Sequence, residues 1–367
     1  MDTSVLSELN IRSVTVPNRF MMAPMCQYSC ETRDGMATEW HHVHYGSRAV
    51  GKAGIVMTES AAVEPEGRIS PYDLGIWTDD HARSLSRTAE FVRSRGSIPA
   101  IQLAHAGRKA CTDRPRRGDG RPVSLDDGGW EVVAPTGHPW PYEDGTAPPT
   151  HRLTRSGIDS VVKSFREAAG RATRNGFEAV EIHAAHGYLL HQFLSPVTNQ
   201  RQDEYGGSFE NRTRFLREVV TAVRKEIGEK LPLFVRISAT DWLPDEPSWD
   251  VDQSVRLAEQ LASLDVDLID VSAGGIRPDV DMVWAGPNYQ VTYAERIRKE
   301  TTADILVGAV GGIKTAQQAE ALVRNERADL AIIGRKFLSD PYFPINAAKE
   351  LGESEEIPPP AQLERGF

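Results

Sequence analysis

Two histidines and a tyrosine, His183, His186 and Tyr188, follow the short apolar segment 178–182. Imidazoles three residues apart on a turn that leaves a strand can converge on one small group. The phenol two residues further on can donate a proton. This spacing favours a clamp for a developing oxyanion together with a general acid. His-x-x-His also occurs as a capping or metal-binding pair, so the choice between these roles and the oxyanion clamp depends on the surrounding sequence.

The elements that would position these side chains recur as short apolar runs, each followed by a segment with helical periodicity. The predicted strands are 20–23, 54–58, 98–103, 179–183, 233–237, 268–271, 305–309 and 330–333. The predicted helices are 39–50, 79–95, 157–175, 208–227, 250–264, 290–299, 314–325 and 342–350. Eight alternating units predict an α/β fold, a (β/α)8 TIM barrel. A doubly wound sheet is the competitor, but no Gly-x-Gly-x-x-Gly follows the first strand.

The length of 367 residues suits a single barrel domain, 1–367, with two additions. The segment 113–150, after the third strand, is rich in glycine, proline and aspartate. We expect it to cap the barrel mouth and to shape substrate specificity. Residues 352–367 form a C-terminal tail.

The composition excludes several classes of protein. The net charge is −10 and no basic stripe stands out, which argues against a nucleic-acid surface. Three cysteines without framework spacing suit a reducing compartment. The N-terminus lacks the pattern of a signal peptide, and no run approaches the ~18 apolar residues of a membrane span. We therefore expect a soluble cytoplasmic protein.

Glycine-rich turns follow the seventh and eighth predicted strands, at 308–312 and at Gly334. Each leads into a helix, and this is the usual phosphate site of a barrel. Arg335 could add a bidentate contact to the anion. The glycines could instead serve only to make tight turns. Both loops together favour a bound phosphate compound.

Gln102 and Arg236 narrow the choice of compound. Both are expected to point from barrel strands into the mouth, where an unpaired arginine would be costly to bury. A flavin ring offers a carbonyl acceptor, and a cation near its N1 stabilises the reduced form. The pattern therefore indicates FMN, with its phosphate near the last two strands.

The sequence resembles the old yellow enzyme family of FMN-dependent ene-reductases over nearly its whole length. The motifs that carry the likeness are 23–28 with Cys26 and Tyr28, 183–188, 195–208, Asn211-Arg212, 308–312 and Gly334-Arg335. His186, Cys26 and the closing segment 363–367 resemble the subgroup called thermophilic-like, which includes xenobiotic reductases.

The resemblance implies a set of site residues. FMN would be held by Ala23, Pro24, Met25, Cys26, Ser60, Gln102, Arg236, Gly311, Gly334 and Arg335. The substrate carbonyl would be bound by His183 and His186 with help from Tyr28, and Cys26 could tune the flavin potential. Arg365 would reach into a neighbouring subunit, which implies a homo-oligomer, a dimer or tetramer. No metal site is implied.

The same likeness implies a reaction. A nicotinamide, NADPH or NADH, would reduce the flavin and leave, and an α,β-unsaturated carbonyl compound would then take its place. The two histidines would polarise the substrate, and Tyr188 would protonate the α-carbon.

Other classes of protein remain open at this point. A metal-dependent barrel hydrolase would use His183 and His186 as ligands, and Glu59 and Asp270 are the nearest acids at strand ends. A phosphate-binding lyase or isomerase would need a strand-end lysine for a Schiff base, which the pattern lacks. A flavin-binding module without turnover would leave the tyrosine idle.

Within the flavin interpretation, a specialised CoA-ester or biosynthetic enone reductase is the alternative. A basic mouth would favour it, and the only hints are Lys109 and the cluster Arg114, Arg116 and Arg117.

Overall fold

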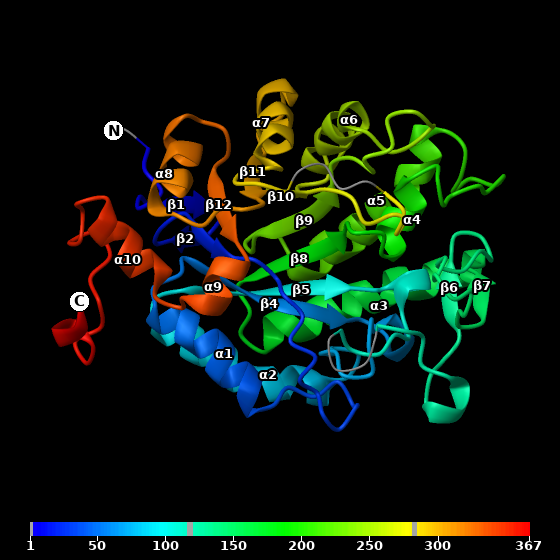
Figure 1. Ribbon diagram of the computed structural model, residues 1–367, viewed down its shortest axis with the longest axis horizontal. Helices are drawn as coiled ribbons and strands as arrows, with labels where there is room; N and C mark the ends of the chain where they lie inside the picture. Colours follow the sequence, from blue (N-terminus) through cyan, green and yellow to red (C-terminus); the bar gives the residue numbers. More distant parts are fainter. Residues whose placement is uncertain (1–2, 116–119, 281–284) are drawn as a thin grey trace.

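The computed structural model describes residues 3–115, 120–280 and 285–367, and its centre is a closed barrel of parallel strands (Figure 1). Around the barrel the strands are β3 (Phe20–Met22), β4 (Ile55–Ala62), β5 (Ile98–Ala104), β8 (Ala179–Ala184), β9 (Leu233–Ser238), β10 (Leu268–Ser272), β11 (Leu306–Val310) and β12 (Leu330–Ile333). Each corresponds to a predicted strand within a few residues, and the predicted (β/α)8 barrel is confirmed.

The helices surround the barrel and alternate with its strands (Figure 1). The predicted ones are α1 (Glu39–Val50), α2 (Asp79–Ser94), α3 (Arg155–Arg174), α5 (Phe209–Ile227), α6 (Val251–Ala262), α7 (Val291–Glu300), α8 (Ala316–Arg324) and α10 (Phe343–Glu350). Ser208 and Thr315 accept hydrogen bonds from the first turns of α5 and α8, as caps. Two short helices, α4 (Leu189–Leu194) and α9 (Arg335–Ser339), escaped prediction because they are too short to show a period.

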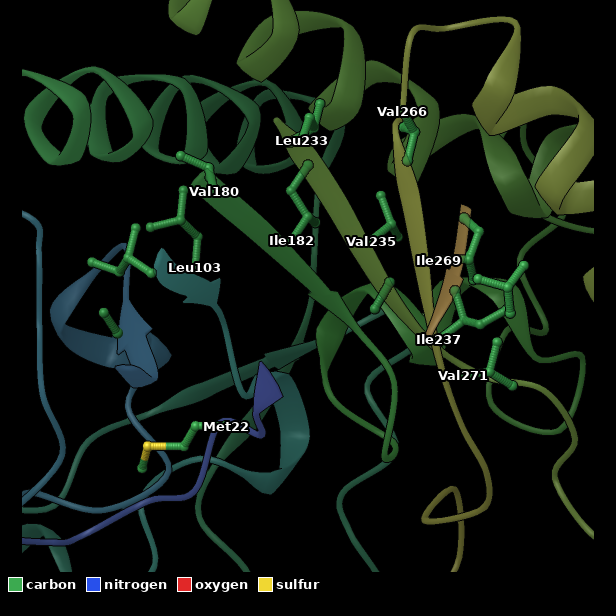
Figure 2. Close-up of a cluster of buried hydrophobic side chains, with 14 of the residues drawn as sticks. Met22, Leu103, Val180, Ile182, Leu233, Val235, Ile237, Val266, Ile269 and Val271 are labelled. Atoms are coloured by element: carbon green, nitrogen blue, oxygen red, sulfur yellow. The ribbon is translucent and has the colours of Figure 1, made fainter. Parts of the chain in front are cut away.

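Side chains alternate between the inside and the outside of the barrel wall. Val180, Ile182, Val235 and Ile237 belong to the large cluster between the strands and the helices (Figure 2). A separate inner cluster fills the barrel itself. Its members on the barrel wall include Met21, Ile55, Met57, Ala100, Ala179, Phe234, Leu268 and Ile332. The period of two therefore fixes which residues of each strand face the barrel axis.

Two small sheets lie at opposite ends of the barrel (Figure 1). The hairpin of β1 (Leu9–Ile11) and β2 (Val14–Val16) packs its apolar side chains into the inner cluster and closes one end. The parallel pair of β6 (Val132–Ala134) and β7 (Thr150–Arg152) bounds much of the 113–150 segment at the other end. Within the described parts of the chain, no helix is both long and apolar enough to cross a membrane.

Candidate active site

A layer of polar side chains replaces the apolar inner cluster towards the carboxyl ends of the strands. Inner positions of β8 read Ala179, Glu181 and His183, so the alternation itself brings an acid and then an imidazole to the barrel axis. Register places Gln102 beside Glu181, and Gln102 Nε2 donates to Glu181 Oε1 at 2.7 Å. The alternation of inward and outward side chains that packs the core therefore also places these polar residues at the base of a site.

Arg236 is ion-paired within the barrel, so the cost of burying an unpaired arginine does not arise. It lies opposite Asp270 in the β9–β10 register, with 3.3 Å between its Nε and Asp270 Oδ2. Burial raises the pKa of both Asp270 and Glu181, and the charge of Asp270 raises that of Glu181 further, while Arg236 opposes both shifts. Two buried carboxyl groups thus lie in the field of one guanidinium, which favours a proton retained on the pair.

This proton makes stability depend on pH. A carboxyl group whose pKa is raised by folding adds stability that is complete below its unfolded pKa, about 4.3, and lost as pH rises through the folded value. We expect the free energy of unfolding of Glu181→Gln to fall less between pH 5 and pH 8 than that of the wild type. Urea unfolding across this range measures the slope, and parallel curves for the two proteins would contradict the shared proton.

A cavity of about 240 Å³ opens above this layer, between β3 and the last three strands. Seven of the residues predicted to hold the cofactor line it: Ala23, Pro24, Met25, Arg236, Gly311, Gly334 and Arg335. The structure adds Tyr289, Gln290, Lys314 and Lys336, which the sequence interpretation missed. Tyr289 and Gln290 precede α7 in a loop without a motif, so no local pattern could have identified them.

The cavity has the properties of a site for a phosphate compound. At Gly311, where φ is +126°, an added Cβ would lie 3.1 Å from Gln290 Cβ, so glycine keeps this wall open. Arg335 is exposed, and its side chain forms no hydrogen bond or ion pair with the other described residues, which leaves its guanidinium available. With Arg236 and Lys314 it makes the lining cationic. These residues fit the predicted FMN.

The turn after β8 brings the histidines and the tyrosine together. The ring centroid of His183 lies 5.1 Å from the ring centroid of His186 and 5.1 Å from that of Tyr188. His183 is buried, whereas His186 and Tyr188 are half-buried and His186 reaches the cavity. Burial, and then the charge of Arg236, lower the pKa of both histidines, so both are neutral at pH 7.

A hydrogen bond selects the tautomer of His183, and both histidines remain donors. His183 Nδ1 accepts from the backbone N–H of Ala185 at 3.3 Å, so its proton lies on Nε2. His186 Nε2 lies 2.7 Å from Ser272 Oγ, whose hydroxyl also lies 3.2 Å from Gln290 Oε1, so the site of the His186 proton depends on which of the two acceptors the hydroxyl uses. Each ring then keeps one N–H donor. Burial raises the pKa of Tyr188, so its phenol is also a protonated donor.

A buried pair behind the turn holds its shape. Gly187 N donates to His191 Nδ1 at 2.8 Å, and His191 Nε2 lies 2.9 Å from Asp241 Oδ1. Gly187 has a φ of +72°, and a Cβ there would lie 2.0 Å from the Gly275 carbonyl oxygen. Glycine is therefore required at this position, and His191 fixes the turn that carries His186.

Cys26, Tyr28 and Ser60 lie outside the lining of the 240 Å³ cavity, as does Gln102. Cys26 Sγ and Ser60 Oγ are 3.3 Å apart, and burial raises the pKa of the Cys26 thiol, so it stays protonated. Tyr28 lines a neighbouring surface cavity. Glu59 and Ser60 were expected after the second strand, but β4 continues to Ala62 through an irregularity between Met57 and Ser60.

The two acids considered as metal ligands, Glu59 and Asp270, are bonded to other residues of the protein. Glu59 accepts from Tyr45 Oη at 3.0 Å and from Gln27 N at 2.8 Å, and His41 Nε2 lies 3.2 Å away. Asp270 is paired with Arg236. In the described part of the chain, no three His, Cys, Asp or Glu side chains are grouped to hold a metal ion.

Two of the remaining basic residues, Lys109 and Arg114, have local partners. Lys109 Nζ donates to the carbonyl of His186 at 2.8 Å and lies 4.4 Å from the centroid of Trp140 in the 113–150 segment. Arg114 pairs with Glu31, while Arg116 and Arg117 lie outside the described residues. Arg365 is exposed and does not line the cavity of its own chain.

The chain is similar to known proteins over nearly its whole length. Residues 6–354 match the model of the NADH:flavin oxidoreductase / NADH oxidase family. The chain is 45% identical to an NADPH dehydrogenase of Geobacillus sp. (strain WCH70), over all of this chain and 99% of that protein. Among solved structures, an old yellow enzyme homologue from Zymomonas mobilis is 27% identical with a TM-score of 0.78. The match covers 95% of this chain and 93% of the homologue. Morphinone reductase is 29% identical with a TM-score of 0.76, and the match covers 96% of this chain and 90% of morphinone reductase.

The family model covers most of the chain, and a relative of the same length is 45% identical to it. Together they establish the family. The chain belongs to the NADH:flavin oxidoreductase / NADH oxidase family, together with the old yellow enzymes, and is an FMN-dependent oxidoreductase that takes electrons from a reduced nicotinamide.

Proposed function

We propose that the enzyme uses NADPH to reduce the C=C bond of α,β-unsaturated carbonyl compounds in a ping-pong reaction. The observation that carries this proposal is the turn after β8, where two neutral imidazoles and a protonated phenol meet beside the cavity. This arrangement suits a substrate that gains negative charge on oxygen and then needs a proton on carbon.

Seven of the ten predicted cofactor residues line the cavity, and we propose that FMN binds there. When bound, FMN supplies hydride acceptance and donation at a single place, so that the nicotinamide and the substrate use the site in turn. Arg335 and the loops at Gly311 and Gly334 would hold its phosphate, and Arg236 would lie against its ring. Cys26, Ser60 and Gln102 would complete the site from the β3–β5 side.

Arg335→Ala is expected to weaken FMN binding about 10–100-fold, because a hydrogen bond to a charged group contributes about 1.5–3 kcal/mol. Fluorescence titration of the apoprotein with FMN measures the dissociation constant. Arg87→Ala, which removes an exposed guanidinium from α2, is the matched control. Equal FMN affinity in Arg335→Ala and the wild type would place the phosphate elsewhere.

The side chains of the turn would act on the substrate in a fixed order. His183 Nε2 and the N–H of His186 would donate to the carbonyl oxygen, which draws electrons from the β-carbon. Tyr188 would then give its proton to the α-carbon. Because both imidazoles are neutral, they stabilise the enolate as hydrogen-bond donors and keep their protons.

The 113–150 segment is proposed to cap the mouth. Its Trp140 covers Lys109, which in turn binds the backbone of His186, so the segment is coupled to the substrate turn. We also propose that Arg365 completes the site of a second subunit in a homo-oligomer, since it is exposed on its own chain. Arg365→Ala should then raise KM for the substrate without loss of FMN, and unchanged kinetics would exclude this role.

Isotope labelling tests the proposed reaction directly. With deuterated NADPH in ordinary water, cyclohexenone should gain deuterium at the β-carbon, where hydride arrives. With unlabelled NADPH in D2O, the label should appear at the α-carbon. Mass and NMR analysis of the product distinguishes the two positions, and formation of an allylic alcohol instead of a saturated ketone would overturn the proposal.

A further inference from the structure

A second, much smaller cavity borders Tyr188. Its volume is about 10 Å³, roughly the space that one water molecule requires. Ser60 of β4, Ala104 at the end of β5, Tyr188 and Asp73 contribute to its wall. Two residues with hydroxyl groups and one with a carboxyl group thus border a space of molecular size, together with small and apolar residues.

The loop between β4 and α2 delivers Asp73 to this place. It folds back along β4, where Ala62 N donates to Leu74 O and Ile76 N donates to Ala62 O, both at 2.9 Å. Asp73 is 2% exposed. Its Oδ2 accepts from the backbone N–H groups of Ile69 and Ser70, at 2.7 and 3.2 Å.

The other carboxyl oxygen of Asp73 has no such partner. Oδ1 is buried and forms no hydrogen bond with any residue in the described ranges. A buried carboxyl oxygen without a partner is costly, and such a group calls for a functional explanation. A water molecule in the small cavity would satisfy Oδ1 and would also reach the Tyr188 hydroxyl.

We propose that Asp73 stores a proton and returns it to Tyr188 through one water molecule in the small cavity. This proposal rests on the proposed function, in which Tyr188 is the proton donor to the substrate. A phenolate left in this buried position would be unfavourable, so the proton must be replaced as it leaves.

The steps balance without a further reactant. The O–H bond of Tyr188 breaks and a C–H bond forms at the α-carbon of the substrate. The phenolate oxygen takes a proton from the water, and the water takes the proton of the Asp73 carboxyl group. Asp73 becomes a carboxylate and regains a proton from solvent between turnovers, which supplies the one proton that each reduction consumes.

The electrostatic surroundings keep this carboxyl group protonated at neutral pH. Burial, and then the charge of Glu59, raise the pKa of Asp73 to about 8, while the backbone N–H bonds and Arg68 oppose the shift. Among the described residues, Glu59 and Arg68 are the charged groups that shift its pKa most. The thiols and phenols coupled to it are Cys26, Cys30, Tyr28 and Tyr188, and burial raises the pKa of each.

Asp73 could instead serve only to shape its turn, and Asp73→Asn separates the two roles. The amide keeps an oxygen for Ile69 and Ser70 but cannot supply a proton. In the wild type, reoxidation by an enone should slow about tenfold per pH unit above pH 8. In Asp73→Asn it should be slow and independent of pH across this range, whereas reduction by NADPH keeps its rate.

A proton inventory adds a measurement that a structural role would not change. Reoxidation rates in mixtures of H2O and D2O should fall on a curve for the wild type, because more than one proton moves, and on a line for Asp73→Asn. Ala104→Val, which fills the small cavity and keeps Asp73, should also give a line. This second variant covers the case in which Asp73→Asn fails to fold.

The possible outcomes distinguish the relay from the proposed function. Wild-type pH profiles and curved inventories in both Asp73→Asn and Ala104→Val would overturn the relay. If Tyr188→Phe is slow in the same assay, the proposed proton donor stands without Asp73. If Tyr188→Phe is reoxidised at the wild-type rate, the proposed donor itself fails, whatever Asp73 does.

Discussion

Tyr188→Phe is expected to slow reoxidation of the reduced enzyme by an enone about 10²–10⁴-fold, the usual contribution of a general acid. Reduction by NADPH should keep its rate, because that half of the reaction transfers hydride and needs no proton from Tyr188. The ring that packs against His183 and lies 5.1 Å from Lys109 Nζ remains in place. Stopped-flow spectroscopy of the two half-reactions measures each rate separately.

Tyr205→Phe is the matched control for this experiment. Tyr205 is a buried tyrosine whose hydroxyl donates to Glu218 on α5, and it lies outside the cavity lining. Both half-reactions should keep their wild-type rates in this variant. Equal slowing of the two half-reactions in Tyr188→Phe would mean that the residue shapes the site and does not donate the proton.

His183→Leu is expected to reduce the rate of enone reduction about 10²–10³-fold, the typical cost of losing one donor to a developing oxyanion. Leucine keeps the apolar bulk at this buried position but removes the Nε2–H. Because burial and Arg236 lower the pKa of His183, the wild-type rate should show no histidine titration near pH 6.5. The pH profile of kcat/KM checks this second point.

A histidine on the outer helix provides the control. His42 is half-buried on α1, where its ring contacts Phe91, and His42→Leu should leave enone reduction unchanged. A His183→Leu enzyme with wild-type kcat/KM would show that the carbonyl oxygen lies away from the turn after β8. Retained FMN absorbance in the variant would show that the barrel itself is intact.

The barrel could be predicted because each strand is short, apolar and followed by a periodic helix. The limits of the prediction lie where local pattern is absent. Helices α4 and α9 have six and five residues, fewer than two turns, so a period cannot appear. Strand β4 was expected to end at Thr58, because Glu59 and Ser60 are polar, yet both are buried and the strand continues to Ala62.

The candidate site could be predicted only where a motif or a strand end marked it. The glycines at 311 and 334 and Arg335 follow strands, and the structure places all three in one cavity. The pairing of Arg236 with Asp270 depends on the register of β9 and β10, which no local pattern specifies. Asp73 comes from a loop that folds back over β4, and its burial results from tertiary contacts alone.

The central claim is most directly tested by the visible spectrum of the purified protein during two anaerobic additions. NADPH should bleach the yellow colour of the bound FMN, and cyclohexenone should then restore it with formation of cyclohexanone. Recovery of the full absorbance by one equivalent of enone is the result that we predict. A protein that bleaches with NADPH but stays colourless with cyclohexenone and other enones would contradict the proposed reduction of the C=C bond.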